Sequence, residues 1–487
     1  MDNGKYEPVI GLEVHAQMKT KSKAFCKCST EYNAPPNTNV CPVCLGHPGT
    51  LPVLNKNLVE FILRLGLATN CTIRDRSIFA RKNYFYPDLP KGYQISQYDQ
   101  PVCYDGYLEI EGSKIGITRI HMEEDSGKSI HDFSTDDSLV DLNRCGVPLI
   151  EIVSEPDIKS PKQATEYLSK LKQLVVYLDI CDGNMEEGSL RCDVNISVKA
   201  KDSKKFGTKC EIKNLNSFKN VTDALEYEIK RQTEVLEKGG GVIHQTMTYD
   251  AKSKTTSPMR SKEEAHDYRY FPEPDLVRVF VDQEWKNKIK SELPELPEQK
   301  AERFVKQYKI PSYDAEVLTQ DRAIADYFEN VCKGVGEKSF KAASNWVMTE
   351  VMRVLNEEKL EIADFRINGK NLSILINLIA EGKISNNIAK EVYAEMLKIT
   401  DLSDEKQNPE FIVKEKNLLQ LTDSAEIESA IKKIINENPN EVKRYKNGET
   451  KLLGFLVGKV MKETSGKANP KTVNDLLKQI LLISNLR

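Results

Sequence analysis

The sequence predicts an α+β protein whose N-terminal part is built on an antiparallel sheet and whose remainder is helical. Up to about residue 290, short runs with a side-chain period of two alternate with turns rich in Gly, Pro and Asn. After the proline-rich residues 293–297, helical periodicity dominates. At 487 residues the chain is too long for one small core. We therefore expect an α+β domain at 1–293, a helical domain at 294–405 and a small helical tail domain at 406–487, the last two separated by a break at 401–409.

The composition excludes several classes of protein. A net charge of -3 and a pI near 6.2 do not mark the whole chain as a nucleic-acid binder. The N-terminus has no apolar segment of signal-peptide length, and no run approaches the length of a membrane span. The eleven cysteines are therefore expected to be reduced thiols. We expect a cytoplasmic protein with no membrane contact.

The first two predicted strands combine an apolar face with catalytic-type polar groups. Residues 9–15 alternate so that Glu13 and His15 share one face and the aliphatic side chains share the other. Residues 116–125 end in three consecutive carboxylates, which a strand must direct to both of its faces: Glu123, Glu124 and Asp125.

Three further runs repeat the pattern. Residues 147–153 are almost entirely apolar apart from Glu151, so they predict a buried strand with one carboxylate that needs a partner. Residues 190–198 and 209–214 alternate cleanly, and their polar side chains are Arg191, Asp193, Asn195, Glu211 and Lys213. Cys192 and Cys210 fall on the apolar faces and are expected in the core.

Any one of these strands could simply expose a charged face to water. Together they are unusual, because a solvated face normally carries Lys, Thr, Ser and Gln. Several carboxylates and an imidazole on one face require a cation. An oxygen-preferring divalent ion such as Mg²⁺ fits Glu-rich ligands and commonly binds together with a substrate phosphate.

A quartet of cysteines predicts a zinc site. Cys26 and Cys28 are followed after twelve residues by Cys41 and Cys44, the spacing of two closely spaced thiolate pairs around a tetrahedral ion. Four thiolates leave no coordination position for water. We therefore expect this Zn²⁺ to stabilise a loop and not to catalyse.

Phosphate binding has one rejected and one open candidate. The sequence at 126–129 resembles the end of a P-loop, but Met122 stands where the first glycine is required. Residues 81–97 combine cations with aromatic rings and prolines, which suits either a loop that grips phosphates and stacks a base or a solvated loop pinned by its aromatics. A second such cluster, at 267–275, is equally compatible with a rigid turn.

Helices are predicted in both parts of the chain. Ser160 and Pro161 begin one amphipathic helix, and a second is predicted at about 221–236. From Glu441 to Arg487 the chain carries ten Lys and Arg against four Asp and Glu, a net charge of +6. The basic tail segment could bind RNA or present an ordinary solvated face.

These motifs resemble the B subunits of the aspartyl/glutamyl-tRNA amidotransferases over essentially the whole chain. The matching stretches are residues 9–15, 81–97, 121–129, 148–157, 186–195, 213–217, 267–275, 454–462 and 468–470. The resemblance implies a cradle-shaped α+β catalytic domain, a helical domain and a tail domain that contacts tRNA. It also implies a tRNA-dependent ligase of protein biosynthesis that works in a heterotrimer with an amidase A subunit and a small C subunit.

The implied reaction amidates Glu on tRNA(Gln), Asp on tRNA(Asn), or both. ATP and Mg²⁺ would phosphorylate the side-chain carboxylate, and ammonia released from glutamine by the amidase subunit would displace the phosphate. The physical need is that a carboxylate is a poor acyl donor until phosphorylation supplies a leaving group.

The resemblance assigns roles residue by residue. The catalytic set is Glu13, His15, Glu123, Glu124, Asp125 and Glu151, with His15, Glu124 and Glu151 as Mg²⁺ ligands. The choice between Glu123 and Glu124 stays open, because a bulge reverses strand parity. ATP and the aminoacyl group would contact Arg81, Lys82, Tyr84, Tyr86, Lys91, Gln94, Ser189, Arg191, Asp193, Asn195, Glu211 and Lys213. In the tail, tRNA would contact Lys451, Lys459, Lys462 and Lys467.

Two other functions are compatible with parts of the sequence. A non-catalytic, zinc-containing tRNA-binding adaptor would need a sheet face rich in Lys and Arg, whereas an acidic face repels RNA unless a metal is bound. An amide-forming ligase for a free small acid would not need the basic tail.

Overall fold

The computed structural model describes residues 4–130, 137–259, 268–400, 405–419, 424–464 and 467–483. Asp267, at the start of one matching stretch, and residues 401–404, within the expected domain break, lie outside these ranges. The chain divides into two compact units, one ending at Leu296 and the other beginning at Pro297. The first is built on a sheet and the second is helical, which confirms the predicted α+β class. Among the described residues, no helix is long and apolar enough to cross a bilayer.

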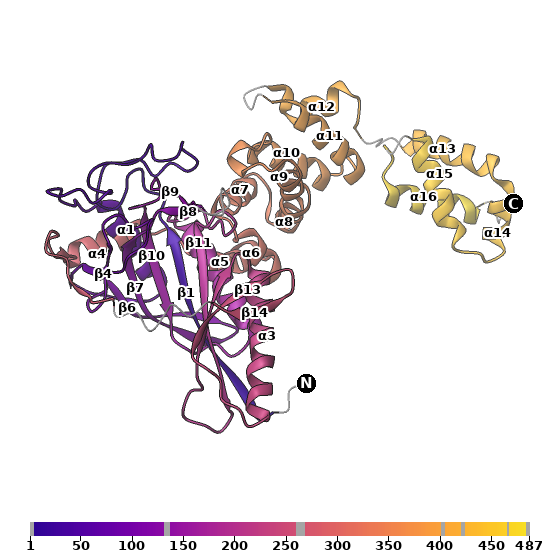
Figure 1. Ribbon diagram of the computed structural model, residues 1–487. Helices are drawn as coiled ribbons and strands as arrows, with labels where there is room; N and C mark the ends of the chain where they lie inside the picture. Colours follow the sequence, from indigo (N-terminus) through magenta and orange to yellow (C-terminus); the bar gives the residue numbers. More distant parts are fainter. Residues whose placement is uncertain are drawn as a thin grey trace. The chain divides into compact units, whose positions relative to one another are not determined.

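A nine-stranded sheet forms the N-terminal unit, with β1 at its centre (Figure 1). The strand order is β14-β13-β12-β11-β1-β10-β7-β6-β2. The strands span β1 Tyr6–Gln17, β2 Thr72–Ile73, β6 Cys103–Ile110, β7 Ser113–Glu124, β10 Pro148–Ser154, β11 Leu190–Ala200, β12 Cys210–Leu215, β13 Gln245–Asp250 and β14 Thr255–Pro258. The described neighbours pair antiparallel except β12 and β13, which pair in parallel, a departure from the all-antiparallel expectation.

The register of four neighbouring strands, β11, β1, β10 and β7, aligns polar residues in a row across the sheet. His15 lies opposite Glu151 on β10 and opposite Arg191 on β11. Glu151 in turn lies opposite His121 on β7. Because directly opposed residues point to the same face, four polar side chains from four strands meet on one side.

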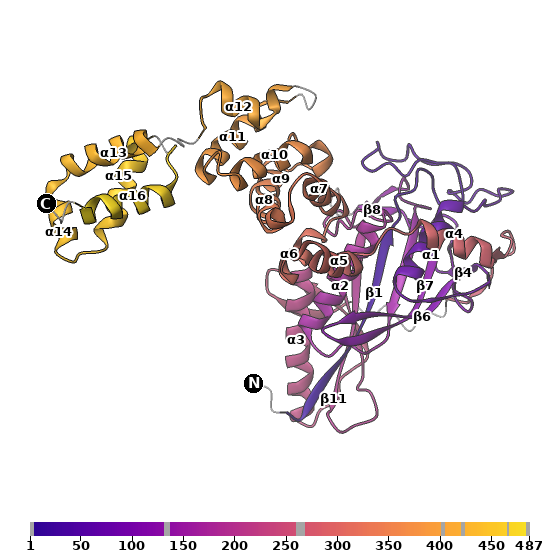
Figure 2. The ribbon, with the colours of Figure 1, turned by 180° about the vertical axis from the view of Figure 1, so that it is seen from behind.

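Three helices cover the other face of the sheet (Figure 2). They are α1 Lys56–Ala68, α2 Pro161–Tyr177 and α3 Phe218–Glu237, and their apolar sides share one core with the inward side chains of β1. The predicted start of α2 is confirmed, because the Ser160 side chain caps the helix and Pro161 stands in the first turn. A fourth helix, α4 Gln283–Glu292, packs on α1.

Small sheets complete the N-terminal unit. The one that matters for the site has the order β15-β4-β5, with β4 at Ala80–Asn83, β5 at Tyr93–Ser96 and β15 at Phe271–Pro272. It contacts β7 through β5. The others pair β3 Arg76–Ser77 with β16 Val279–Phe280 and β8 Lys128–Ile130 with β9 Leu139–Asp141.

The helical unit contains two separate hydrophobic cores. The first is formed by α5 Pro297–Tyr308, α6 Ser312–Leu318, α7 Arg322–Lys333, η1 Glu337–Ser339, α8 Phe340–Trp346, the π-helical turn η2 Val347–Val351, α9 Met352–Glu358, η3 Ile362–Asp364, α10 Gly369–Ala380, α11 Asn386–Lys398, η4 Glu405–Gln407 and α12 Pro409–Glu415. The second is formed by α13 Ser424–Glu437, α14 Pro439–Lys446, α15 Leu452–Glu463 and α16 Pro470–Ile483.

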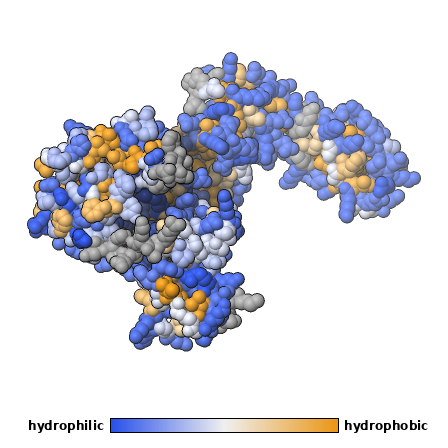
Figure 3. Space-filling model, in the orientation of Figure 1, coloured by the Kyte–Doolittle hydropathy of each residue, from blue (hydrophilic) through white to orange (hydrophobic). Residues whose placement is uncertain are grey.

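The sequence-based strands and core residues agree well with this fold. Each of the five predicted alternating runs is a strand, and Cys192 and Cys210 are buried in the core as expected. The visible surface is mostly polar and is interrupted by separate hydrophobic patches on the N-terminal unit and on the helical unit (Figure 3).

Candidate active site

Three side chains from three strands converge at the middle of the polar sheet face. Ligand-type atoms of His15, Glu123 and Glu151 all lie within 4.8 Å of one another. The Nε2 atom of His15 lies 3.5 Å from a Glu151 oxygen and 3.8 Å from a Glu123 oxygen. Atoms that bind one Mg²⁺ about 2.1 Å away lie roughly 3 Å apart when adjacent. The cluster is therefore close to the size that one divalent cation requires.

A second imidazole, that of His121, contacts both carboxylates of this cluster. His121 is 3% exposed, and its Nε2 lies 3.4 Å from a Glu151 oxygen and 4.0 Å from a Glu123 oxygen. The two carboxylates are thus flanked by His15 on one side and His121 on the other. Sequence reasoning did not select His121, although the alternation of residues 116–125 places it two residues before Glu123 and therefore on the same strand face.

The electrostatics of the cluster favour a charged Glu151 beside its two imidazoles. Burial alone would raise the pKa of Glu151, but His121 and His15 hold it well below its usual range. Burial alone would lower the pKa of His15, but its hydrogen bond to Glu151 and the charges of Glu151 and Glu123 raise it. Replacing the shared protons by a cation would satisfy the same set of ligands.

Basic side chains face the same cavity as the cluster. The cavity measures about 830 Å³ including its open mouth, and its lining includes His15, Glu123, Lys82, Arg191 and Lys213. Burial alone would lower the pKa of Lys82, but the charge of Glu123 raises it, so the ammonium stays charged. Three cations beside a carboxylate cluster make a site suited to a polyphosphate chelated by a metal.

Asp125 anchors one of these cations. Its carboxylate accepts hydrogen bonds from Arg191 at 2.8 Å and from Gln17 at 2.7 Å, and Arg144 lies 3.7 Å away. Burial alone would raise the pKa of Asp125, but the two arginines lower it. Asp125 therefore acts here as a fixed negative partner that aims Arg191 into the cavity.

A second row of acids lies along β1, β11 and β12. Asn195 donates to Glu13 at 2.8 Å, and Lys213 lies 3.6 Å from Asp193 and 3.2 Å from Glu211. Burial and the neighbouring charge of Glu151 raise the pKa of Glu13, and burial raises the pKa of Asp193. A raised pKa makes each of these carboxylates a stronger base than an ordinary exposed one.

The small sheet forms one wall of the cavity. Lys82, Tyr84 and Gln94 line it, and Ser96 donates a hydrogen bond to Glu123 at 3.3 Å. The Tyr84 hydroxyl donates to the Gln94 side chain at 3.2 Å. Tyr86 adjoins Tyr84 and is 56% exposed.

Four predicted site residues lie away from the cluster: Glu124, Lys91, Arg81 and Ser189. Glu124 points to the opposite face of β7, where it pairs with Lys91 and accepts from the Ile95 amide at 2.9 Å. The ligand set that the structure brings together therefore contains Glu123, and Glu124 is not part of it. Arg81 forms a two-pronged pair with Glu273 on the outer side of the small sheet, and the buried Ser189 donates to Asp182.

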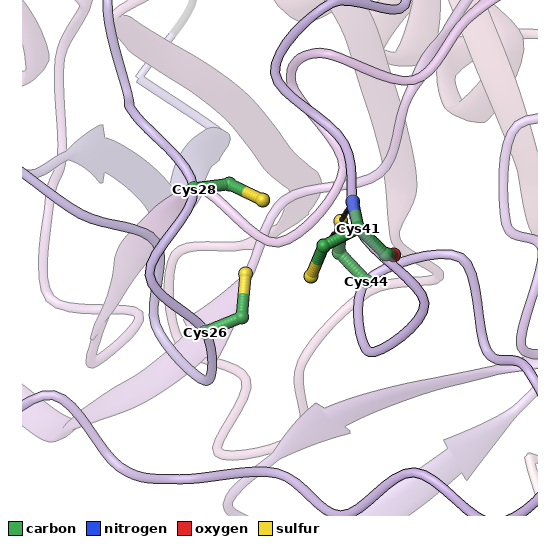
Figure 4. Close-up of side chains that lie close together, drawn as sticks. All are labelled: Cys26, Cys28, Cys41 and Cys44. Atoms are coloured by element: carbon green, nitrogen blue, oxygen red, sulfur yellow. Dashed lines mark hydrogen bonds between the residues drawn. The ribbon is translucent and has the colours of Figure 1, made fainter.

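The four cysteines of the quartet approach one another from two loop segments (Figure 4). Their sulfurs point inward and lie within 4.8 Å of one another. A hydrogen bond between thiols raises the pKa of Cys26 and lowers that of Cys44. Lys23, fully buried, places its Nζ 3.7 Å from the Cys44 sulfur and 3.4 Å from the Leu142 carbonyl. Sequence reasoning missed this buried cation, because its burial depends on the fold of the loop.

The predicted tail lysines lie in the second core of the helical unit. Lys451 precedes α15, while Lys459 and Lys462 lie on its exposed side. Lys467 lies in the segment between α15 and α16. In the described part of the tail none of the four has a carboxylate partner, whereas Lys433 pairs with Glu463.

Comparisons with known proteins agree with this architecture. Residues 8–287 match the family model described as the GatB/GatE catalytic domain, and residues 326–481 match the one described as the GatB domain. The B subunit of the aspartyl/glutamyl-tRNA(Asn/Gln) amidotransferase from Thermodesulfovibrio yellowstonii is 57% identical, over 98% of this chain and 99% of its own. The proteins of the same name from Chlorobium phaeobacteroides and Caldicellulosiruptor saccharolyticus are each 55% identical over the same shares.

Proposed function

This chain belongs to the family of B subunits of the aspartyl/glutamyl-tRNA(Asn/Gln) amidotransferase, and from this membership we propose that it amidates Glu on tRNA(Gln), Asp on tRNA(Asn), or both. The subunit is the catalytic one of a glutamine-dependent enzyme. The chemistry divides into phosphorylation of the side-chain carboxylate by ATP and displacement of the phosphate by ammonia. The observation that carries the proposal is the convergence of His15, Glu123 and Glu151. His15 and Glu123 also line one cavity together with three cations.

We assign the phosphorylation step to this cluster. His15, Glu123 and Glu151 would hold Mg²⁺, which supplies charge stabilisation for the transferred phosphoryl group. The donor set fits, because two carboxylates and several open positions suit an ion that keeps water and phosphate ligands. Lys82, Arg191 and Lys213 would bind the phosphates. His121 and Ser96 keep the carboxylates in place.

We assign proton transfer during amide formation to the second row of acids. Attack of ammonia on the acyl phosphate forms the C–N bond, releases phosphate and leaves one proton to be removed. Glu13, whose raised pKa brings it nearer to neutrality, can accept that proton. Asp193, paired with Lys213 at 3.6 Å, can hold the attacking nitrogen near the carbonyl.

The cysteine quartet is proposed to hold a structural Zn²⁺. Four sulfurs from two loops meet at the spacing of a closed tetrahedral site, and the buried Lys23 offsets the negative charge that four thiolates bring. The loop has only short secondary structure of its own, which supports a stabilising role.

The partners follow from the reaction. A subunit that uses ammonia needs an amidase to release it from glutamine, so we propose assembly with the amidase A subunit and the small C subunit. Lys451, Lys459, Lys462 and Lys467 are proposed to contact tRNA through phosphates. The proposed location is the cytoplasm, where aminoacyl-tRNA is used.

The direct test is amidation by the complex assembled from this full chain with its A and C subunits. Wild type should convert at least one of Glu-tRNA(Gln) and Asp-tRNA(Asn), with ADP released only when the misacylated tRNA is present. Glu151→Gln should lower both rates by about 1,000-fold or more. Glu109→Gln, which alters an exposed acid on β6, is the matched control and should retain full activity.

Two results would contradict the proposal. The first is wild-type complex that binds both tRNAs tightly but produces neither amide, which would favour a tRNA-binding adaptor. The second is Glu151→Gln with unchanged ADP release, which would remove the assignment of phosphorylation to this cluster.

A further inference from the structure

The small sheet β15-β4-β5 has two chemically different faces. Lys82 lies opposite Gln94 in the register, and both line the catalytic cavity. Arg81, one residue away, points to the outer face and pairs with Glu273. The inner face therefore continues through every second residue, which brings Tyr84 beside Lys82 along this wall.

Five tyrosines extend this inner face into one aromatic surface, here termed the tyrosine wall. Tyr98 and Tyr270 stack face to face, with ring centroids 4.2 Å apart and an angle of 6° between the rings. Tyr268 meets Tyr84 and Tyr270 edge-on at 5.9 and 6.0 Å, and Tyr84 meets Tyr86 at 6.0 Å. The rings come from segments about 170 residues apart, so tertiary structure assembles the wall.

The outer rings of the wall remain open to a ligand. Tyr98 is 51% exposed and Tyr86 is 56% exposed, although each touches another ring. An aromatic cluster that serves only packing buries its rings, because exposed aromatic area costs free energy. Because Tyr98 stacks on Tyr270 through one face of its ring and is half exposed, its second face can stack one further planar ring.

The wall borders the proposed phosphate site. The Lys82 ammonium lies 5.0 Å from the Tyr268 ring centre and 5.9 Å from that of Tyr84. Lys82 and Tyr84 also line the cavity that contains His15 and Glu123. A planar ring on the wall and an anion in the cavity can thus belong to one nucleotide.

We propose that the tyrosine wall binds an adenine base, stacked on Tyr98, while the rest of that nucleotide extends into the cavity. The inference rests on the proposed function, because both of its substrates present adenosine: ATP carries one, and the 3′ end of an aminoacyl-tRNA is another. Stacking on aromatic rings tolerates any base, so the substrates determine that the base is adenine.

The experiment measures affinity on the full chain with the adenine present or absent. The nucleotide probes are ATP and inorganic tripolyphosphate, in the presence of Mg²⁺. The RNA probes are an acceptor minihelix ending in CCA, aminoacylated through a stable amide, and the same minihelix with an abasic terminal residue. The variants are Tyr98→Ala and Tyr98→Trp, with Tyr313→Ala, a 70% exposed tyrosine in the helical unit, as the control.

Tyr98→Ala should weaken binding of one adenine-containing probe by about 5- to 100-fold, as expected for loss of one stacking partner. Its adenine-free counterpart should change by less than about 2-fold. Loss confined to ATP assigns the wall to the cosubstrate, and loss confined to the intact minihelix assigns it to the tRNA end. Tyr98→Trp should keep or increase affinity, and Tyr313→Ala should match wild type.

Three outcomes would overturn the inference. One is wild-type affinity for both adenine probes in Tyr98→Ala and in the double variant Tyr86→Ala, Tyr98→Ala. Another is an equal loss for tripolyphosphate and ATP, which would indicate a disturbed cavity. The third is a loss of adenine-probe affinity in Tyr98→Trp as large as the loss in Tyr98→Ala, although the circular dichroism of Tyr98→Trp is native. An amidation assay separates this inference from the proposed function. If the wild-type complex turns over normally and the tyrosine-wall variants keep the wild-type KM values, the inference about the tyrosine wall fails and the proposed function stands.

Discussion

Glu123 and Glu124 are consecutive carboxylates that a strand turns to opposite faces, and this fixes what each can do. Glu123 faces His15 and Glu151, whereas Glu124 is 2% exposed on the other side and pairs with the buried Lys91. A carboxylate that neutralises a buried lysine contributes to stability whether or not a metal binds. The two glutamates should therefore respond differently to the same substitution.

Glu123→Gln should raise the Mg²⁺ concentration that half-saturates ATP cleavage by about 10-fold or more, with little change in urea stability, because it removes a proposed metal ligand. Glu124→Gln should lower the free energy of unfolding by about 3 kcal/mol, because it leaves Lys91 buried without its partner. The double variant Lys91→Met, Glu124→Gln should regain most of that stability. A larger shift in Mg²⁺ requirement for Glu124→Gln than for Glu123→Gln would show that the assignment is reversed.

Lys23 makes a second prediction at this scale. Its ammonium is fully buried beside the Cys44 sulfur, and four thiolates around one Zn²⁺ carry a net charge of about -2 that a neighbouring cation offsets. Lys23→Met should therefore weaken zinc binding by about 10-fold, measured by competition with a chromogenic chelator. Lys27→Met, an exposed lysine between Cys26 and Cys28, is the control. Wild-type zinc affinity in Lys23→Met would contradict a role for its charge.

At the scale of the element, side-chain alternation is local information, and it was sufficient to predict strands and their faces. Glu13 and His15 are two residues apart, as are Arg191 and Asp193, and this spacing correctly placed each pair on the polar face. The pairing of β1 with β10 and β11 was not readable, because each partner lies more than a hundred residues away and no local signal specifies it. The choice between Glu123 and Glu124 stayed open for a different reason, because a bulge in the strand reverses which of the two faces the cluster.

The small sheet shows the same limit more strongly. The composition of residues 81–97 suits either a loop that grips phosphates or a solvated loop pinned by its aromatics, and the structure divides these residues between two faces. Lys82 and Tyr84 line the cavity, whereas Arg81 is bound by Glu273, which lies 192 residues later in the chain. The sequence revealed the residue types of this site, but their division depends on the pairing of β4 with β15.

A buried carboxylate on α3, hydrogen-bonded within its helix and to β14, predicts a pH effect. Glu228 on α3 is fully buried and accepts hydrogen bonds from Arg231, Gln232 and, on β14, Thr256. Burial alone would raise its pKa, but these partners lower it below its ordinary value. A carboxyl group whose pKa is lower in the folded state stabilises the protein above its unfolded pKa, and that contribution is lost as the pH falls through the folded pKa.

Glu228→Gln should therefore lower the free energy of unfolding by about 2 kcal/mol at pH 7, and the difference from wild type should shrink as the pH falls below about 4.5. Urea unfolding of the Trp346→Phe background reports on the N-terminal unit through Trp285, the other tryptophan of the chain. A difference that stays constant from pH 7 to pH 3.5 would contradict the linkage and indicate a packing effect.

At the scale of the whole molecule, the proposed metal site and the basic excess of the tail belong to different parts of the chain. The net charge of the protein is -3, and the cluster of acids around His15 and Glu151 belongs to the N-terminal unit. The basic excess of residues 441–487 belongs to a group of helices with its own core. Because of this separation, lysines of the tail can bind RNA phosphates without pairing with the carboxylates of the proposed metal site.

The tail lysines therefore predict how tRNA binding depends on salt. Lys451, Lys459, Lys462 and Lys467 have no carboxylate partner among the described tail residues, so each can neutralise a phosphate and release a counterion. Changing all four to Gln should make the slope of log affinity against log salt shallower by about 3. The KM for aminoacyl-tRNA should rise by about 10-fold or more at roughly 150 mM salt, while kcat should stay close to wild type because the catalytic cavity is unchanged.

The control replaces basic residues of the same tail that are already paired. Lys433 pairs with Glu463, and Arg444 pairs with Glu449 at 2.7 Å, so neither cation is available to a phosphate without breaking an existing contact. The double variant Lys433→Gln, Arg444→Gln should shift the salt slope by less than about 1. Equal shifts in both variants would mean that overall charge attracts the tRNA, and an unchanged slope in the quadruple variant would place the tRNA contact elsewhere in the chain.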